Sequence, residues 1–182
     1  MPLSRAHGKT PREPWQYGDM ALKEVKKWIN FRHRLVPYLY HAACQSHQSG
    51  IPMIRPLVME YPKDPIAKIQ NLSYMLGDAL LISPGFDRDE YELYLPEGRW
   101  QDIESKEVYE GMTFVHIENK AFADGGTSLR VFQKEGTSIP LFAQKEVLHV
   151  PAQLWKQEDL SLIHILRAHE TDQYLVCRLL LE

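Results

Sequence analysis

The chain of 182 residues is 44% hydrophobic and 25% charged, a composition typical of globular proteins and not of disordered ones. Its formal net charge of −3 gives no indication of a nucleic acid or an anionic membrane surface as a partner. No apolar run approaches the roughly 20 residues that a membrane-spanning helix needs. The two cysteines, Cys44 and Cys177, are far apart and belong to no motif, which favours free thiols and a cytoplasmic location as the default expectation.

The first 18 residues predict an irregular segment, because prolines and glycines interrupt them repeatedly. Such a loop needs a scaffold beside it. Within it, Arg5 and His7 are two positions apart, so an extended backbone points both side chains the same way. From the residues alone, His7 is most simply a solvated loop histidine, and a role in a binding site is the alternative.

A long amphipathic helix is expected next, with Asp19 as its N-cap and Gly50 as its end. Apolar residues recur there at spacings of three, four and seven: Val25, Trp28, Ile29, Leu35, Val36, Leu39 and Ala43. Pro37 lies inside this pattern and is expected to kink the helix or divide it in two. The histidines of this helix are not spaced four apart, so they do not form a metal-ligand motif.

The segment Met53–Glu60 is apolar enough for a buried strand, although Pro56 makes it an imperfect one. If it is a barrel strand, Glu60 lies at the end where barrel enzymes place their chemistry. We interpret Glu60 as structural, because a glutamate before a proline-containing turn is commonly just solvated. Asp64 and Pro65 then predict a helix start, and apolar residues at helical spacing continue to a stop at Gly77.

The stretch from Ser73 to Trp100 separates two kinds of pattern. Residues 79–82 form an unbroken apolar run, typical of a strand buried on both faces. Tyr91, Leu93 and Leu95 alternate with Glu90, Glu92 and Tyr94, which predicts a strand with one wet face. Helical spacing dominates before this stretch, and short strands with turns dominate after it.

Short strands at this spacing predict an antiparallel sandwich. The expected strands are Trp100–Ile103, Glu107–Tyr109, Thr113–Ile117, Leu129–Gln133 and Ser138–Phe142. Beyond residue 146, Leu160–Leu166 and Tyr174–Leu181 are each apolar enough for a further strand.

Several short segments between Pro2 and Leu141 are similar to sequence motifs of one known protein family. They are Ser4–Gly8, Arg12–Trp15, Arg34–Tyr40, Gly50–Leu57, Tyr74–Phe86, Tyr94–Trp100 and Leu129–Leu141. In this order they resemble glycoside hydrolase family 31, which includes α-glucosidases and α-xylosidases. The resemblance implies an α+β fragment in which the C-terminal end of a (β/α)8 barrel, with helices and one strand, precedes an antiparallel β-sandwich.

The division implied is 1–78 for the barrel portion, 79–147 for the proximal C-terminal β-sandwich and 148–182 for a tail of uncertain assignment. The parent implied is a retaining exo-α-glycosidase that removes terminal α-linked glucose or xylose from an oligosaccharide. Retention needs two carboxyl groups, and in the family both are aspartates on barrel strands upstream of the motif matched by Ser4–Gly8. No catalytic residue is therefore assigned to this chain, and no metal or organic cofactor is implied.

By position in the motif, the resemblance assigns His7 to the sugar bound beside the nucleophile and Arg5 to a supporting role in substrate binding. Asp19, Asp64, Asp78, Asp87, Asp89 and Asp102 each fall at a cap or turn signal, and the isolated chain is expected to hydrolyse nothing.

The alternative function is a non-catalytic β-sandwich that binds carbohydrate or a partner protein through Trp100, Tyr109 and Trp155. It requires an aromatic platform on an exposed face, and it leaves the long helix and the Arg5/His7 loop unexplained.

If the helix stripe evolved to pack against an N-terminal barrel portion that lies outside this chain, the chain exposes an apolar surface. Self-association is the expected consequence.

Overall fold

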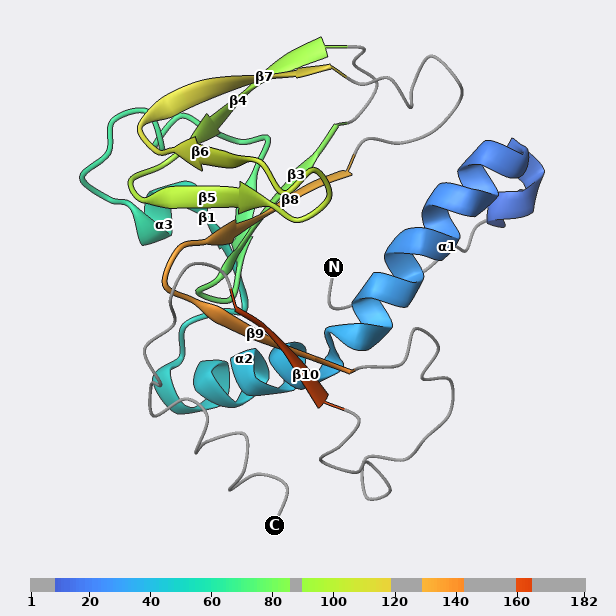
Figure 1. Ribbon diagram of the computed structural model, residues 1–182, viewed down its shortest axis with the longest axis horizontal. Helices are drawn as coiled ribbons and strands as arrows, with labels where there is room; N and C mark the ends of the chain where they lie inside the picture. The colour runs from blue at the N-terminus through green and yellow to red at the C-terminus, as the bar shows by residue number, and fades with distance from the viewer. Residues whose placement is uncertain (1–8, 86–89, 119–128, 143–159, 165–182) are drawn as a thin grey trace.

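The computed structural model describes residues 9–85, 90–118, 129–142 and 160–164 (Figure 1). The helical elements are the 3-10 helix η1 (Pro14–Tyr17) and the α-helices α1 (Asp19–Arg34), α2 (Val36–Ser49) and α3 (Leu57–Glu60). The strands are β1 (Ile54–Pro56), β2 (Tyr74–Leu76), β3 (Leu80–Pro84), β4 (Glu90–Leu95), β5 (Arg99–Asp102), β6 (Val108–Glu110), β7 (Thr113–Glu118), β8 (Leu129–Lys134), β9 (Ser138–Phe142) and β10 (Leu160–His164).

The described strands form antiparallel sheets, which agrees with the predicted β-sandwich. Six strands form one sheet in the order β1-β2-β3-β8-β5-β6, while β4 pairs with β7 and β9 pairs with β10. The five strands predicted between residues 100 and 142 are all present, with ends within a residue or so of those expected. The predicted strand at 160–166 is also present as β10, and the one at 174–181 lies outside the described residues.

Strand β3 separates two cores, one on each face of the six-stranded sheet. On one face, Leu81 packs in a cluster with Leu93 of β4 and Val115 of β7. On the other face, Leu80 and Ile82 pack with residues of α2, β8 and β9. Both faces of β3 are thus buried, which confirms the prediction from its unbroken apolar run.

The predicted long helix is divided in two, as Pro37 implied. Leu35 links α1 and α2, and Pro37 occupies the first turn of α2, where its missing N–H costs no hydrogen bond. Gly50 ends α2 in the left-handed conformation, with φ of 75°, as expected. The predicted N-cap is wrong by one residue, because Gly18 caps α1 and Asp19 lies in its first turn, where a carboxylate still favours the helix dipole.

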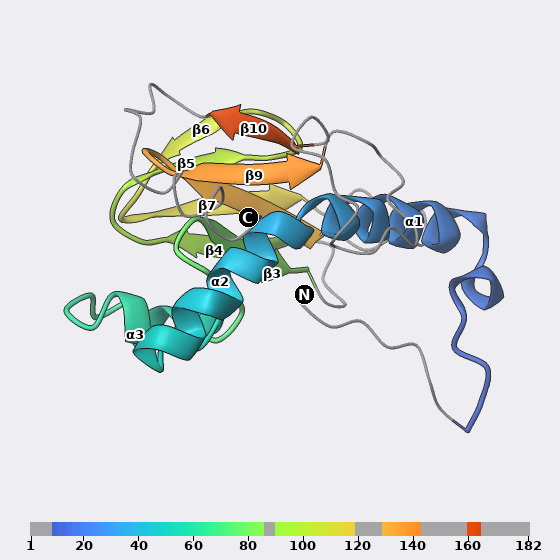
Figure 2. The same ribbon diagram turned by 90° about the horizontal axis from the view of Figure 1, so that it is seen from below.

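Helices α1 and α2 cover one side of the sheets unequally. Helix α2 lies against the sheets and buries Tyr38 and Ala42, whereas α1 buries no residue completely and reaches away from the strands (Figures 1 and 2). Trp28 and Phe31 are the part of α1 that packs, half-buried, against the second core. Of the expected apolar stripe on α1, Val25 and Trp28 are partly buried and Ile29 is 38% exposed.

Two predictions between residues 53 and 76 are wrong. The expected barrel strand Met53–Glu60 is only a three-residue strand followed by the short helix α3, and it pairs antiparallel with β2 in the six-stranded sheet. The expected helix from Pro65 to Leu76 is a series of turns followed by β2. Asp64 does cap this segment, since its Oδ1 accepts from the amides of Ile66 and Ala67 at 2.8 and 3.2 Å.

The division expected between residues 78 and 79 falls in the turn between β2 and β3, which are neighbouring strands of one sheet. Helix α2 is joined to this turn through a single hydroxyl. The Tyr38 hydroxyl donates to the carbonyl of Leu76 at 2.7 Å and accepts from the amide of Ala79 at 3.1 Å. Between them, Gly77 has φ of 59°, and a Cβ there would lie 2.3 Å from the Tyr38 oxygen. The turn therefore needs glycine both for its conformation and for the approach of the tyrosine.

Replacing Tyr38 with phenylalanine is expected to lower the free energy of unfolding by about 2 kcal/mol. The substitution keeps the ring but leaves a buried carbonyl and a buried amide without their partner, and each unsatisfied group costs roughly 1–3 kcal/mol. Urea unfolding followed by circular dichroism measures the change.

The matched control is Tyr40→Phe on the same helix, because the Tyr40 side chain is 55% exposed. It is expected to change stability by less than about 0.5 kcal/mol, as for other exposed surface sites. Equal losses in the two variants would contradict the role assigned to the Tyr38 hydroxyl.

Candidate functional site

The two residues that the sequence assigns to substrate binding, Arg5 and His7, lie outside the described residues. Their roles therefore stay predictions. The described part of the chain offers three features to consider as a site. They are a buried ion-pair cluster, a cleft beside that cluster, and carboxylates that accept hydrogen bonds from main-chain amides in turns.

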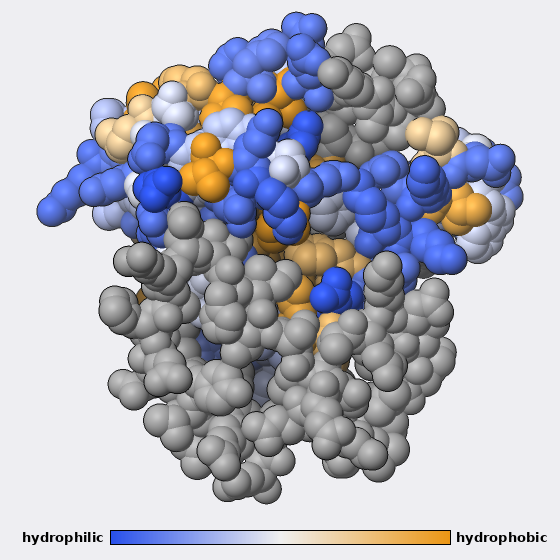
Figure 3. Space-filling model, in the orientation of Figure 1, coloured by the Kyte–Doolittle hydropathy of each residue, from blue (hydrophilic) through white to orange (hydrophobic). Residues whose placement is uncertain are grey.

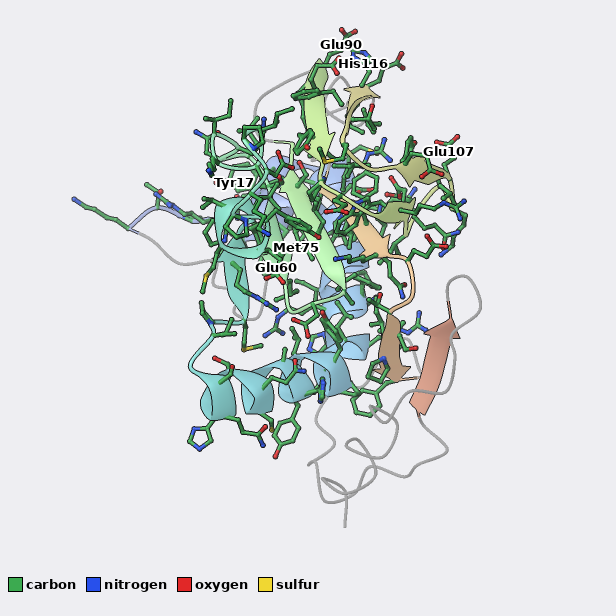
Figure 4. All side chains as sticks on the ribbon, turned by 90° about the vertical axis from the view of Figure 1, so that its left-hand side faces the viewer. Tyr17, Glu60, Met75, Glu90, Glu107 and His116 are labelled. Atoms are coloured by element: carbon green, nitrogen blue, oxygen red, sulfur yellow. The ribbon has the colours of Figure 1, made fainter. Side chains whose placement is uncertain are left out.

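The ion-pair cluster centres on Arg55 of β1, whose residue surface is 7% exposed. Its Nη1 donates to Glu60 Oε2 at 2.7 Å and its Nη2 donates to Asp78 Oδ1 at 2.5 Å (Glu60 is labelled in Figure 4). Burial by itself lowers the pKa of Arg55, but the bond to Asp78 and the charges of Glu60 and Asp78 outweigh it and raise the pKa. Both carboxylates thus neutralise a buried cation, which agrees with the structural interpretation of Glu60.

A cleft of about 340 Å³ opens beside this cluster. It lies between the C-terminal half of α2, the link into β1 and the turn after β2. Its lining residues are Ala42, Gln45, Ser46, Gln48, Ser49, Ile51, Pro52, Met53, Arg55, Gly77 and Asp78. The sequence reasoning missed this site; the one local signal was an arginine in the otherwise apolar segment 53–58.

Asp102 is a buried aspartate whose carboxylate holds a turn. Asp102 accepts from the amides of Glu104 and Ser105 at 2.7 and 3.2 Å, and its second oxygen accepts from Arg130 at 3.2 Å. These bonds account for its burial without a catalytic role.

The exposed end of the β4–β7 pair carries His116 with glutamates on either side. His116 Nδ1 lies 3.0 Å from Glu92 Oε1, and Nε2 lies 3.9 Å from Glu90 Oε2 (Figure 4). The hydrogen bond to Glu92 and the surrounding negative charge raise the pKa of His116. In the part of the chain that the structure describes, neither this group nor any other set of three or more His, Cys, Asp or Glu side chains is arranged to hold a metal ion. Among the described helices, none is long and apolar enough to cross a membrane.

Comparison with known proteins gives two consecutive matches along the chain. Residues 1–42 match the Glycosyl hydrolases family 31 TIM-barrel domain, and residues 50–146 match the Glycosyl hydrolase family 31 C-terminal domain. The second match alone spans more than half of the chain. The chain belongs to glycoside hydrolase family 31. The resemblance seen in the sequence motifs is therefore confirmed.

The relatives of this family 31 chain include proteins named as an α-glucosidase and an α-xylosidase. The chain is 31% identical over 173 residues to "Alpha-glucosidase 2" of Bacillus thermoamyloliquefaciens, covering 92% of this chain and 21% of the relative. It is 31% identical to "Alpha-xylosidase" of Saccharolobus solfataricus, covering 79% of this chain and 19% of the relative. The chain thus spans about a fifth of the length of these curated relatives.

A solved structure of the family has the same fold over the shared region. The Flavobacterium johnsoniae family 31 dextranase complexed with glucose matches with a TM-score of 0.67 and 31% identity, over 74% of this chain and 16% of the dextranase chain. The sheets described above are therefore the C-terminal domain architecture of family 31. The second family match begins at residue 50, so it includes β1 and β2 with the later strands.

The aromatic platform required by the alternative function does not include Trp100. This side chain is 0% exposed in the first core, and its Nε1 donates to the carbonyl of Pro96 at 2.8 Å. Tyr109 is partly buried and packs edge-on against Phe132, with ring centroids 5.9 Å apart. The third aromatic, Trp155, lies outside the described residues. Trp100 therefore has a packing role in this family 31 domain.

Asp64 joins the turns before β2 to the C-terminal end of β4. Tyr94 was expected on the wet face of β4, but it is 0% exposed, and its hydroxyl donates to Asp64 Oδ2 at 2.6 Å. Burial by itself raises the pKa of Asp64, but the bonds from Tyr94, Ala67 and Ile66 outweigh it and lower the pKa. Burial and the bond to Asp64 raise the pKa of Tyr94.

Replacing Tyr94 with phenylalanine is expected to make the protein more sensitive to acid. A carboxyl whose pKa is lowered on folding stabilises the fold above its unfolded pKa, and this contribution is lost as the pH falls through the folded pKa. Without the Tyr94 hydroxyl, the pKa of Asp64 rises, so the acid unfolding midpoint moves to higher pH. The free energy of unfolding at neutral pH falls by about 1.5–3 kcal/mol, the usual contribution of a hydrogen bond to a charged group.

Tyr109→Phe is the matched control, because the Tyr109 hydroxyl also donates to a carboxylate, that of Glu107, but at an exposed site. Burial and this bond raise the pKa of Tyr109 to about 12, so its hydroxyl stays protonated across the range tested. Acid titration followed by tryptophan fluorescence is expected to shift for Tyr94→Phe and to stay unchanged for Tyr109→Phe. The same midpoint in all three proteins would rule out the role given to Asp64.

Proposed function

We propose that this chain forms part of a retaining exo-α-glycosidase that removes terminal α-linked glucose or xylose from oligosaccharides. The observation that carries the proposal is the pair of consecutive family 31 matches, supported by relatives named as an α-glucosidase and an α-xylosidase. The family resemblance supplies the mechanism, in which one carboxylate attacks the sugar and a second acts as acid and base.

The chain contributes a substrate contact and a supporting domain, and the two catalytic aspartates come from sequence upstream of the Ser4–Gly8 motif. His7 holds the sugar beside the nucleophile, and Arg5 supports it. The described carboxylates fit this division, since Asp64, Asp78 and Asp102 are all engaged in structural hydrogen bonds. No cofactor takes part, because carboxylates alone carry out this kind of cleavage.

A chimaeric enzyme tests this proposal directly. The 173 residues of the Bacillus α-glucosidase that match this chain are replaced by the corresponding residues of the chain. The chimaera is expected to hydrolyse p-nitrophenyl α-glucoside or α-xyloside, and His7→Ala is expected to lower kcat/KM by about 100-fold or more, as for loss of a polar contact made in the transition state. His47→Ala, an exposed position on α2, is the control and is expected to leave kcat/KM unchanged.

The isolated chain is assayed beside the chimaera and is expected to show no turnover. Turnover by the isolated chain that falls in its own His7→Ala variant would mean that the chain carries a complete pocket. An active chimaera whose rate is unaffected by His7→Ala would remove His7 from substrate binding.

We also propose that the isolated chain self-associates through α1, which would pack against the N-terminal barrel portion in the parent. Three apolar side chains of this helix are exposed, Met20 at 41%, Leu22 at 37% and Ile29 at 38%, and Figure 3 shows hydrophobic groups interrupting its hydrophilic surface. Leu22 and Ile29 are seven residues apart, so they lie on one face of the helix.

The double variant Leu22→Lys/Ile29→Lys is expected to shift the chain toward monomer, because it places charges in the apolar contact. Size-exclusion chromatography with light scattering measures the mass. Gln16→Lys/His47→Lys adds the same charge at other exposed positions and is expected to leave the mass unchanged. A wild-type chain that is monomeric at all concentrations would refute this proposal.

A further inference from the structure

Met112 lies in the short link between β6 and β7 with a backbone conformation that its residue type rarely adopts. Its φ is 58°, in the left-handed region that is uncommon for any residue except glycine. The residue before it is held in place, because the Gly111 amide donates to the carbonyl of Gly98 at 2.7 Å. A Cβ on Gly111 would also lie 2.1 Å from the carbonyl oxygen of Pro96. A strained residue persists only where its surroundings fix it, so the contacts of the Met112 side chain are informative.

The Met112 side chain contacts a buried hydrogen bond. The Tyr94 hydroxyl donates to Asp64 Oδ2 at 2.6 Å and lies 3.4 Å from Met112 Sδ. Tyr94 is 0% exposed, whereas Met112 is 59% exposed. Phe114 packs against the Tyr94 ring with centroids 5.2 Å apart and is itself 48% exposed. On this side, Met112 and Phe114 therefore lie between the Tyr94–Asp64 hydrogen bond and the solvent.

A thioether in this position is open to one specific modification. A two-electron oxidant such as hydrogen peroxide converts methionine to its sulfoxide. A lone pair of Sδ attacks one peroxide oxygen, the S–O bond forms as the O–O bond breaks, and the proton of the transferred oxygen ends on the departing hydroxide to give water. Sulfur loses two electrons and the peroxide gains them. The flexible apolar side chain becomes a polar one, and a weak acceptor is replaced by an oxygen.

The sulfoxide oxygen does not suit the surroundings of the sulfur. The Tyr94 hydroxyl has one proton, and the Asp64 carboxylate is the stronger acceptor for it because it is charged. A further oxygen beside this pair would find no proton to share and would be repelled by the carboxylate, so the oxidised side chain turns toward water. Water then reaches the Tyr94–Asp64 bond and competes for its partners, which reduces what the bond contributes to stability.

We propose that Met112 is a site of reversible oxidation by peroxide, and that its oxidation uncovers the Tyr94–Asp64 hydrogen bond and lowers the stability of the domain. This property does not depend on the glycosidase function proposed above. It would make the fold itself responsive to oxidising conditions.

The other methionines provide comparisons within the same chain. Met75 is 0% exposed in the first core, so peroxide reaches it slowly while the protein is folded. Met20 of α1 and Met59 of α3 are 41% and 47% exposed, so they are expected to be oxidised as Met112 is. Solvent access alone therefore does not distinguish Met112, and its contact with the Tyr94 hydroxyl does.

The test treats the full chain with hydrogen peroxide at neutral pH. Peptide mass spectrometry measures the sulfoxide at each methionine, and circular dichroism measures the thermal unfolding midpoint. Met112 is expected to be oxidised at least about tenfold faster than Met75, as its exposure implies. The midpoint is expected to fall by about 2–6 °C, the usual effect of weakening one buried hydrogen bond in a chain of this length. Methionine sulfoxide reductases of both stereospecificities are expected to restore it.

Four variants separate Met112 from the other methionines. Met112→Leu keeps an apolar side chain that peroxide does not oxidise, and it is expected to lose most of the peroxide effect. Met112→Gln places a polar side chain there and is expected to lower the midpoint without peroxide. Met59→Leu is the matched control and is expected to keep the full effect. In Tyr94→Phe there is no hydroxyl to uncover, so oxidation is expected to lower the midpoint by less than half of the wild-type shift.

Five results would overturn the proposal. They are oxidation of Met112 no faster than that of Met75, an unchanged midpoint after complete oxidation of Met112, a peroxide shift in Met112→Leu equal to that of the wild type, an equal shift in Tyr94→Phe, and a midpoint that the reductases do not restore. The third would assign the effect to another methionine. The fourth would show that it does not act through the Tyr94 hydroxyl, and the fifth would show that the modification is not reversible.

Discussion

The arrangement of this domain depends on one buried hydroxyl. Tyr38 both donates to and accepts from the turn between β2 and β3, so it satisfies two main-chain groups that the turn leaves unpaired. The contact is possible because Gly77 has no Cβ and tolerates a positive φ. Through this contact, α2 is fixed relative to β3, the strand on which both cores are built. The adjacent Asp78 is placed to pair with Arg55, which ties the edge strand β1 to the same turn.

The central position of β3 explains the layered packing. Leu81 faces the core shared with β4 and β7, and Leu80 and Ile82 face the core shared with the helices and β9. A strand with solvent on neither side has no polar face, which is why its sequence is an unbroken apolar run. Trp100 extends the first core on the neighbouring part of the sheet, where its ring is fully buried and its N–H is paired. Burial at this position serves packing, and a surface platform for sugars is not available there.

The strands after residue 79 were predictable because their signals are local. Turn residues bound these strands, alternation marks β4, and an unbroken apolar run marks β3. The structure of segment 53–76 could not be predicted in the same way. An aspartate before Pro65 predicts a capped turn whether or not a helix follows it. Asp64 caps that turn as expected, but its other oxygen binds Tyr94, thirty residues away. That long-range bond also explains why Tyr94 is buried against its strand pattern. No window of neighbouring residues contains this information.

The candidate sites also differ in how far local sequence can predict them. Arg5 and His7 follow from a contiguous motif, so resemblance alone identifies them. The cleft joins α2, the start of β1 and the turn after β2, and none of these segments has a binding motif of its own. Only the fold brings Gln48, Arg55 and Asp78 together. The buried charge of Arg55 needs both carboxylates for its stability, and the same requirement leaves a half-exposed acceptor at the cleft. The ion pair that neutralises Arg55 thus also places Asp78 at the edge of the cleft.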